Sequence, residues 1–367
     1  MRSRARRLLL FAVILLAWFA VFEAGLRRWG SSEAAPAFQG LFTGDPVIGY
    51  RLKPGARTRF TTSEFDTWIA INGAGVRDDE EIGPKAPDEK RIVILGDSLV
   101  LSVQVPFDRT FGELLERRLN EGSGTTRYRV INAGVQGYGP VEALLFFRRV
   151  VQHLQPDLVL VSVFVGNDAE EAVTARRLLD GERPATEVLS EGLATRLRRL
   201  VRRSMVLQVL RLRLVAVTDR FRSVSGPPEP PLQSYAARPA PRIGEGIRIT
   251  TEVLRQLAAE AEAAGAATGI VLMPARFQID DADYGRLKEI VRQTGGELVR
   301  DAATERFAAA LGELRLPMID LLPPLRRALP GPDLFFQENV HLTLRGHAVV
   351  AGALADFLRE ERLVEER

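Results

Sequence analysis

Apolar residues along this chain fall into five short runs that are separated by amphipathic stretches. The runs are rich in Val, Ile or Leu or are flanked by turn residues, as is typical of buried strands. They cover residues 91–95, 129–132, 157–164, 269–273 and 317–320. Elsewhere apolar positions recur every three or four residues, which predicts helices over 111–119, 141–154 and 250–264. This alternation predicts an α/β fold with three α/β/α layers around a parallel sheet.

The N-terminal end has the pattern of a membrane-targeting segment. Four arginines precede an unbroken apolar run over residues 8–22. Continuing to Leu26 gives about twenty residues, enough for a transmembrane helix at roughly 1.5 Å per residue. A cleaved signal peptide is the alternative, but the Ala-x-Ala at 35–37 lies far downstream. The excess of arginine before the run predicts a single-pass inner (cytoplasmic) membrane protein whose main domain faces the periplasm or exterior.

The pattern divides the chain into three predicted parts. Residues 1–30 form the basic end and the anchor, 31–88 a linker with pre-domain strands, and 89–362 the α/β domain. A helical and Pro-rich insertion is expected at 170–248, between the third and fourth strands. Its Pro-rich part, at 227–241, is typical of an extended linker. Its basic amphipathic part is expected to lie on anionic lipid, to cap the active site, or to be an ordinary solvated helix.

Composition narrows the chemistry. The 367 residues include 50 basic and 47 acidic side chains, a formal charge of +3, so no nucleic-acid partner is expected. The chain has no cysteine and three histidines, which excludes thiolate chemistry and disfavours a metal site. Neither a Gly-x-Gly-x-x-Gly nor a Walker loop occurs. We therefore predict no metal and no cofactor.

Polar residues follow the predicted strands at their carboxyl ends, where ligands bind in parallel sheets. The blocks are Gly96-Asp97-Ser98, Asn132-Ala133-Gly134, Gly166-Asn167-Asp168 and, after the fifth strand, Glu338-Asn339-Val340-His341. Ser98, His341 and Glu338 are the residue types of a serine nucleophile, its base and the acid that orients the base. The backbone N–H groups of Ser98 and Gly134 and the side-chain amide of Asn167 are candidate oxyanion-hole donors.

The other polar residues near these blocks are expected to have supporting or structural roles. Three positions support the site: Asp97, Gly166 and Asp168. Asp168 and Asp320 are also the alternative acids, should Glu338 not reach the base. The remaining histidines, His347 and His153, are expected to be structural.

The four blocks resemble, in order, those of the SGNH branch of the GDSL hydrolases. The family's Ser, Gly, Asn and His correspond to Ser98, Gly134, Asn167 and His341. The resemblance covers roughly residues 45–358 and implies a flavodoxin-like SGNH hydrolase fold with acyl-ester chemistry. One position departs from the family, which usually has Asp where this chain has Glu338.

Two further segments resemble a narrower group of the family. Residues 45–54 and 71–77 are similar to the pre-domain strands of membrane-anchored bacterial SGNH proteins, and residues 273–276 to relatives of the alginate O-acetyltransferases. The resemblance implies an envelope-facing serine esterase acting on O-acyl, chiefly O-acetyl, esters of a carbohydrate or lipid. The alternatives are an O-acyltransferase that modifies an envelope polysaccharide and an inactive glycan-binding pseudoenzyme.

Overall fold

The computed structural model describes residues 40–121, 124–182, 232–329 and 333–364, with isolated positions nearer the N-terminus. The elements named below belong to one compact unit formed by Ala37–Thr186 and Pro230–Arg367. The predicted anchor at 8–26 and the basic amphipathic part of the insertion lie almost wholly outside the described residues. Within the described ranges no helix is long and apolar enough to cross a membrane.

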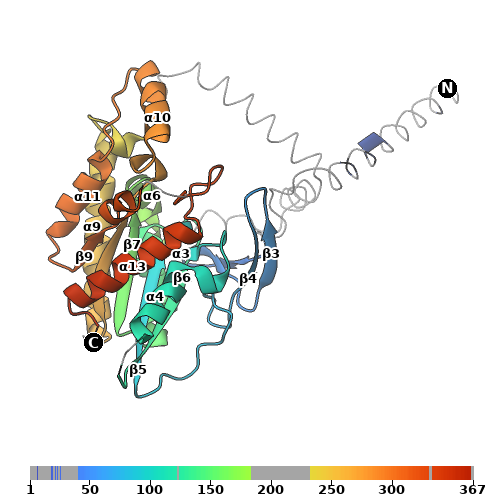
Figure 1. The fold of residues 1–367 in the computed structure, drawn as a ribbon, viewed down its shortest axis with the longest axis vertical. Helices are drawn as coiled ribbons and strands as arrows, with labels where there is room; N and C mark the ends of the chain where they lie inside the picture. The colour runs from blue at the N-terminus through green and yellow to red at the C-terminus, as the bar shows by residue number, and fades with distance from the viewer. Residues whose placement is uncertain are drawn as a thin grey trace. The chain divides into compact units, whose positions relative to one another are not determined.

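A five-stranded parallel sheet forms the centre of the unit, in the strand order β6-β5-β7-β8-β9 (Figure 1). The strands are β5 (Glu89–Gly96), β6 (Arg127–Gly134), β7 (Leu158–Phe164), β8 (Ala267–Met273) and β9 (Met318–Asp320). They confirm the five predicted runs. The chain reverses its direction of travel across the sheet between β5 and β7, so the ends of these two strands form the switch point of a flavodoxin-like sheet.

Helices cover both faces of this sheet. Those of the described ranges are α3 (Ser98–Leu101), α4 (Phe111–Asn120), α5 (Pro140–Arg149), α6 (Asp168–Ala175), α9 (Pro241–Ala263), α10 (Asp281–Gln293), α11 (Ala302–Gly312), α12 (Leu322–Arg327) and α13 (Leu344–Glu360). In Figure 1, α4 and α13 lie side by side over one face, and they contact each other. Contacts also join α9 to α5, α6 and α11.

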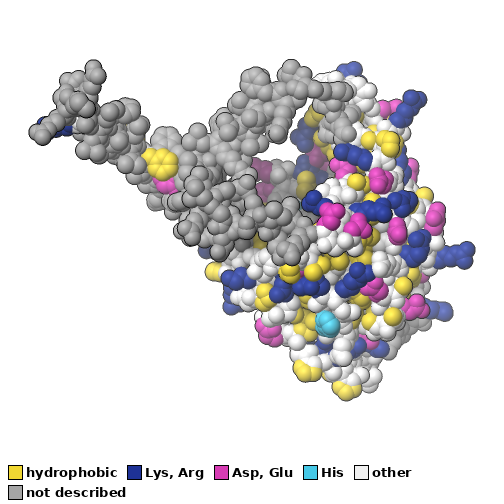
Figure 2. Space-filling model, turned by 180° about the vertical axis from the view of Figure 1, so that it is seen from behind, with side chains coloured by type: hydrophobic (Ala, Val, Ile, Leu, Met, Phe, Trp, Pro, Cys, Tyr) yellow, Lys and Arg dark blue, Asp and Glu magenta, His cyan; other side chains and the backbone are white. Residues whose placement is uncertain are grey.

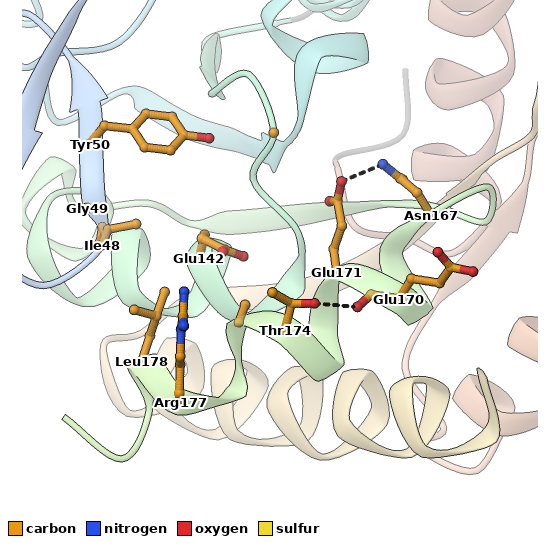
Figure 3. Close-up of a pocket in the computed structure, with 12 residues that line it drawn as sticks. Ile48, Gly49, Tyr50, Glu142, Asn167, Glu170, Glu171, Thr174, Arg177 and Leu178 are labelled. Carbon is orange, nitrogen blue, oxygen red and sulfur yellow. Dashed lines mark hydrogen bonds between the residues drawn. The ribbon is translucent and has the colours of Figure 1, made fainter. Parts of the chain in front are cut away.

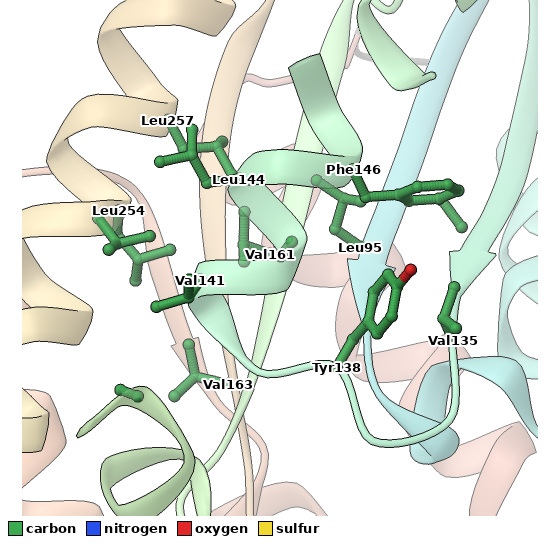
Figure 4. Packing of buried hydrophobic residues seen from close by; sticks show 14 of the residues in the cluster. Leu95, Val135, Tyr138, Val141, Leu144, Phe146, Val161, Val163, Leu254 and Leu257 are labelled. Carbon is green, nitrogen blue, oxygen red and sulfur yellow. The ribbon is translucent and has the colours of Figure 1, made fainter. Parts of the chain in front are cut away.

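Alternation along the strands builds two separate cores. In β5, Val93 and Leu95 belong to the cluster that contains α5, α6 and α9, whereas Ile92 and Ile94 belong to the cluster with α4 and α13. Successive side chains of a strand point to opposite faces, so a strand apolar at every position is buried on both. Figure 4 shows the first cluster, with Leu95 and side chains of β7, α5 and α9 packed together. The three predicted layers are confirmed.

The insertion differs from its predicted extent at both described ends. Its first residues belong to α6 and its last to α9, which begins at Pro241 because a proline fits the first turn of a helix. These two helices are in contact so close that a Cβ on Gly246 would lie 1.7 Å from the carbonyl oxygen of Ala169. The ring of Tyr235 is buried, with its centroid 4.6 Å from that of Phe277. Residues 232–240 therefore pack on the domain and are not the expected extended linker.

Two antiparallel hairpins precede the sheet. The strands are β1 (Phe42–Asp45) with β2 (Gly49–Leu52), and β3 (Arg57–Thr61) with β4 (Asp66–Ala70). In the first hairpin, the carbonyl oxygen of Tyr50 accepts a hydrogen bond from the hydroxyl of Tyr138, in the loop after β6. In the second, the ring of Phe65 lies 5.5 Å from that of Phe336, close to the predicted catalytic histidine in sequence. Both hairpins thus pack against loops at the carboxyl end of the sheet.

Charged side chains of both signs are spread over the described surface. On the face in Figure 2, basic and acidic side chains lie interspersed. Several form ion pairs, such as Arg148 with Glu260 at 2.6 Å. This distribution matches the near balance of charge in the sequence.

Candidate active site

The nucleophile candidate Ser98 stands at the switch point of the sheet. β5 ends at Gly96, and α3 begins at Ser98 with Asp97 as its N-cap. The Asp97 carboxylate accepts a hydrogen bond from the backbone N–H of Leu99 at 2.8 Å. The carboxylate therefore holds the turn in which Ser98 lies.

The Gly134 block lies directly against the Ser98 helix. A Cβ on Gly134 would stand 2.3 Å from the backbone nitrogen of Leu101, so only glycine allows this approach. The Asn132 side-chain amide joins the same elements by donating to the carbonyl oxygen of Val100 at 2.7 Å. Its oxygen accepts the N–H of Gly134 at 3.1 Å. The N–H that was predicted to face an oxyanion thus bonds Asn132 in this structure.

The Asn167 block follows β7, the neighbour of β5 in the sheet. Asn167 is the N-cap of α6, and its side-chain nitrogen Nδ2 donates to Oε1 of Glu171 at 2.6 Å. Asp168 is buried and accepts the N–H of Phe164 at 2.8 Å, which closes the turn between β7 and α6. A Cβ on Gly166 would come within 2.6 Å of the Phe164 ring. Asp168 and Gly166 thus shape the turn that carries Asn167.

Electrostatics link the Ser98 and Asn167 turns. Burial raises the pKa of Asp97 to about 6. Burial, together with the nearby carboxyls of Asp97 and Glu170, raises the pKa of Glu171 to about 7. The pKa of Asp168 is also well above its usual value, because the group is buried and faces Asp97 and Glu171. The two turns therefore bring several carboxyl groups within electrostatic reach of one another.

The base candidate His341 lies in the loop before α13. Its ring nitrogen Nδ1 is hydrogen-bonded to the side-chain oxygen of Asn339. An amide oxygen only accepts, so Nδ1 carries the proton and Nε2 presents its lone pair. In the part of the chain described, Nε2 is buried and has no hydrogen-bond partner. Burial lowers the pKa of the ring to about 4, so His341 is a neutral base at ordinary pH.

The histidine loop and the nucleophile helix contribute to the same hydrophobic core. Leu99, next to Ser98, and Leu342, next to His341, are buried members of the same hydrophobic cluster. The second hairpin and the loop after β8 hold the histidine loop in place. The Glu64 carboxylate accepts a hydrogen bond from the backbone N–H of Gln337 at 2.6 Å, and the Arg276 guanidinium donates to the carbonyl oxygen of Gln337 at 2.5 Å. In the sequence, Arg276 was noted only because its segment resembles a known family. Neither contact could be predicted from the spacing of residues along the chain.

The predicted orienting acid does not contact the base in this structure. The Glu338 carboxylate is exposed and accepts the hydroxyl of Ser63 at 2.8 Å. The loop turns it outward because its own N–H bonds to Glu64. The alternative acids are also engaged elsewhere, Asp168 as described above and Asp320 with the N–H of Leu322 at 2.8 Å. Asn339, which lies two residues before His341 and was not predicted to have a role, takes the orienting position.

This geometry predicts that Asn339 matters more than Glu338. We expect Asn339→Ala to lower kcat on the order of 10²-fold, because a ring that has lost its orienting partner is misplaced for proton transfer. Glu338→Gln should change kcat by less than about threefold, because the amide can still accept from Ser63. Steady-state kinetics on an acetyl ester measure both. The reverse ranking would show that Glu338 swings to the ring during turnover.

The remaining histidines occupy structural positions. His347 is buried, accepts the N–H of Phe111 at 3.2 Å on Nδ1, and stacks on the Phe111 ring. His153 lies exposed in the 3₁₀ turn Val151–Leu154, which follows α5 where a continuous helix was expected.

Comparison with known proteins finds one family model that matches the C-terminal part of the chain. Residues 235–367 match the family model described as SGNH hydrolase-like domain, acetyltransferase AlgX. The matched range contains His341, and the other three blocks precede it. A search of curated proteins finds no match.

Similar solved structures are distant in sequence. They include the crystal structure of TesA, with 14% identity, coverage of 74% of this chain and 99% of that one, and a TM-score of 0.41. LAE5, an alpha/beta hydrolase enzyme from the metagenome of Lake Arreo, Spain, has 16% identity, coverage of 74% and 95%, and a TM-score of 0.41. Axe2, an acetylxylan esterase from Geobacillus stearothermophilus, has 14% identity, coverage of 76% and 97%, and a TM-score of 0.40.

Residues 235–367 therefore match an SGNH hydrolase-like domain, the class that the resemblance of the four blocks implied. This is a class of ester-acting hydrolases and acyltransferases.

Proposed function

We propose that this protein is a serine esterase that removes O-acyl groups, chiefly O-acetyl, from a carbohydrate. The observation that carries the proposal is the state of His341. Its Nδ1 is fixed by Asn339, and its buried Nε2 has no partner in the described structure. Its neighbour Leu342 belongs to the same hydrophobic cluster as Leu99, the neighbour of Ser98. A neutral ring nitrogen in this state is available to accept a proton from a serine hydroxyl, as a general base does.

The proposed reaction has two halves. The Ser98 hydroxyl oxygen attacks the ester carbonyl carbon while Nε2 of His341 takes its proton. The ester C–O bond then breaks, and His341 returns the proton to the departing sugar hydroxyl. In the second half, His341 takes a proton from water while the water oxygen attacks the acyl-Ser98 carbonyl carbon. The bond from that carbon to the Ser98 oxygen then breaks, His341 returns the proton to this oxygen, and the acid leaves. The Asn167 amide and the Ser98 backbone N–H donate to the oxyanion in both halves.

A pocket beside Asn167 is the proposed place for the sugar. It has a volume of about 480 Å³, within the range of small-molecule sites. Figure 3 shows Tyr50 of the first hairpin on one side and Glu142 and Glu171 on the other. Carboxyl groups and a tyrosine ring suit a hydroxyl-rich ligand, because carboxyl oxygens accept hydrogen bonds from hydroxyls.

An O-acyltransferase is the second candidate, and the family match favours it because that model's description names an acetyltransferase. The first half-reaction is then identical, and a sugar hydroxyl replaces water in the second. Incubation with an acetyl donor and a xylo-oligosaccharide, followed by mass spectrometry, separates the two. We expect free acetate in proportion to donor consumed. Acetylated oligosaccharide as the main product would establish the transferase instead.

Attachment to the membrane belongs to the same proposal. The apolar run at 8–22 and the arginines before it support an anchor that leaves the catalytic domain on the outer side of the cytoplasmic membrane. An acylated envelope polysaccharide or lipid ester would be within reach of such a domain.

The pKa of His341 sets the expected pH dependence. Only the neutral ring accepts a proton, and burial lowers its pKa from 6.5 to about 4. The acid limb of kcat/KM should therefore have an apparent pKa near 4, with activity rising as the pH rises through it. A pH series with p-nitrophenyl acetate measures this. An acid limb between pH 6 and 7 would mean that a carboxylate, not the Asn339 amide, supports the ring during catalysis.

A further inference from the structure

One hydrogen bond holds the side chain of Asn167. Nδ2 donates to Oε1 of Glu171 at 2.6 Å, and Figure 3 draws this contact at the wall of the pocket. Glu171 lies one helical turn after Asn167 on α6, a spacing that places the two side chains on the same face. The amide oxygen Oδ1 is buried and has no partner among the described residues. The orientation of the amide therefore depends on Glu171.

The orientation matters because the two ends of an amide have opposite roles. The nitrogen carries two N–H groups and donates, whereas the oxygen only accepts. With one N–H given to Glu171, the second is left to donate to an oxyanion. An amide rotated by half a turn would present its oxygen to the oxyanion, where the two oxygens would repel each other.

Burial reduces the electrostatic cost of a carboxyl group at this place. An ionised Glu171 would disfavour a developing oxyanion nearby. Its pKa is raised to about 7, mainly by burial and then by Asp97 and Glu170. Near neutral pH a large share of the group is thus uncharged. In both protonation states a carboxyl oxygen accepts the Asn167 N–H.

We propose that Glu171 is a positioning residue of the oxyanion hole: it holds the Asn167 amide with its nitrogen, not its oxygen, available to the reaction. The inference rests on the proposed function, in which Asn167 donates to the oxyanion.

Kinetics on the purified full-length chain test this role. Glu171→Ala should lower kcat for p-nitrophenyl acetate 10- to 100-fold with KM changed less than about twofold, because the donor acts on the transition state. Glu171→Gln should keep kcat within about threefold, because its amide oxygen still accepts from Asn167. The matched control is Glu252→Ala, since Glu252 is an exposed helical glutamate that also bonds a side chain four residues earlier, that of Arg248. It should keep the kcat of the unmodified chain.

A spectroscopic readout separates this inference from the proposed function. The ¹H–¹⁵N signals of the Asn167 side-chain amide are assigned by their loss in Asn167→Ala. In the unmodified chain and in Glu171→Gln, one of the two amide protons should be shifted downfield and protected from exchange. In Glu171→Ala neither proton should show this behaviour. A protected proton in a chain without esterase activity would refute the function and leave the orienting contact intact. An unchanged kcat in Glu171→Ala, or a protected proton that survives there, would overturn the inference.

Discussion

Replacing Ser98 by alanine should lower kcat/KM for p-nitrophenyl acetate by on the order of 10⁴-fold or more. Without the hydroxyl no acyl-enzyme can form, and only the slow direct attack of water remains. The side chain is half-buried at the start of α3, and the turn is held by the backbone and by Asp97, so the fold should persist. Matched circular dichroism spectra and thermal midpoints check that it does.

The control for this prediction is a serine close by that the mechanism does not use. Ser102 is buried and donates its hydroxyl to the carbonyl oxygen of Leu99 at 2.6 Å. Ser102→Ala removes that bond and should cost about 1 kcal/mol of stability, with kcat nearly unchanged. If Ser98→Ala retained more than a tenth of the activity, the nucleophile would have to be sought elsewhere.

Two glycines on one helix should respond to alanine with opposite signs. A Cβ on Gly246 would stand 1.7 Å from the carbonyl oxygen of Ala169, so Gly246→Ala must push α9 away from α6. We expect a loss of about 1–3 kcal/mol or more in the free energy of unfolding. A Cβ on Gly244 would meet nothing within 4 Å, and Gly244→Ala should stabilise the protein by about 0.5–1 kcal/mol.

Denaturant or thermal unfolding of the two variants measures this contrast. The helix α6 begins with the Asn167 turn, so Gly246→Ala should also lower kcat. Equal effects of the two substitutions would refute the close contact of α6 with α9. That contact is what places the beginning of α9 within the domain.

The sheet could be predicted from the sequence because its strands are buried on both faces. A run such as Ile92 to Leu95 is apolar at every position and ends at Gly96, which marks a strand and its end together. The start of α9 could not be predicted in the same way. Prolines around Pro241 are typical of a linker, and only the packing of Tyr235 on Phe277 shows that this segment belongs to the domain.

The sequence suggests candidate residues for the site but not the hydrogen bonds among them. Ser98, Gly134, Asn167 and His341 are candidates because each follows a strand or lies in a recognisable block. Which side chain reaches Nδ1 of His341 depends on how the loop is turned, and that is set by Ser63 and Glu64, far away in the sequence. Spacing alone therefore favoured Glu338 over Asn339. The contact of Glu171 with Asn167 was also not predicted, although two residues four positions apart on a helix lie on the same face and could have indicated it.

A fluorophosphonate serine probe tests directly whether Ser98 is an acyl-accepting nucleophile. The full-length chain is labelled, digested and mapped by mass spectrometry, beside Ser98→Ala and Ser102→Ala. We expect one labelled peptide, with the adduct on Ser98, that is lost in Ser98→Ala and kept in Ser102→Ala. A folded chain that takes no label, or takes it at another serine, would show that Ser98 is not the nucleophile. Absence of any label would make the glycan-binding pseudoenzyme the leading explanation.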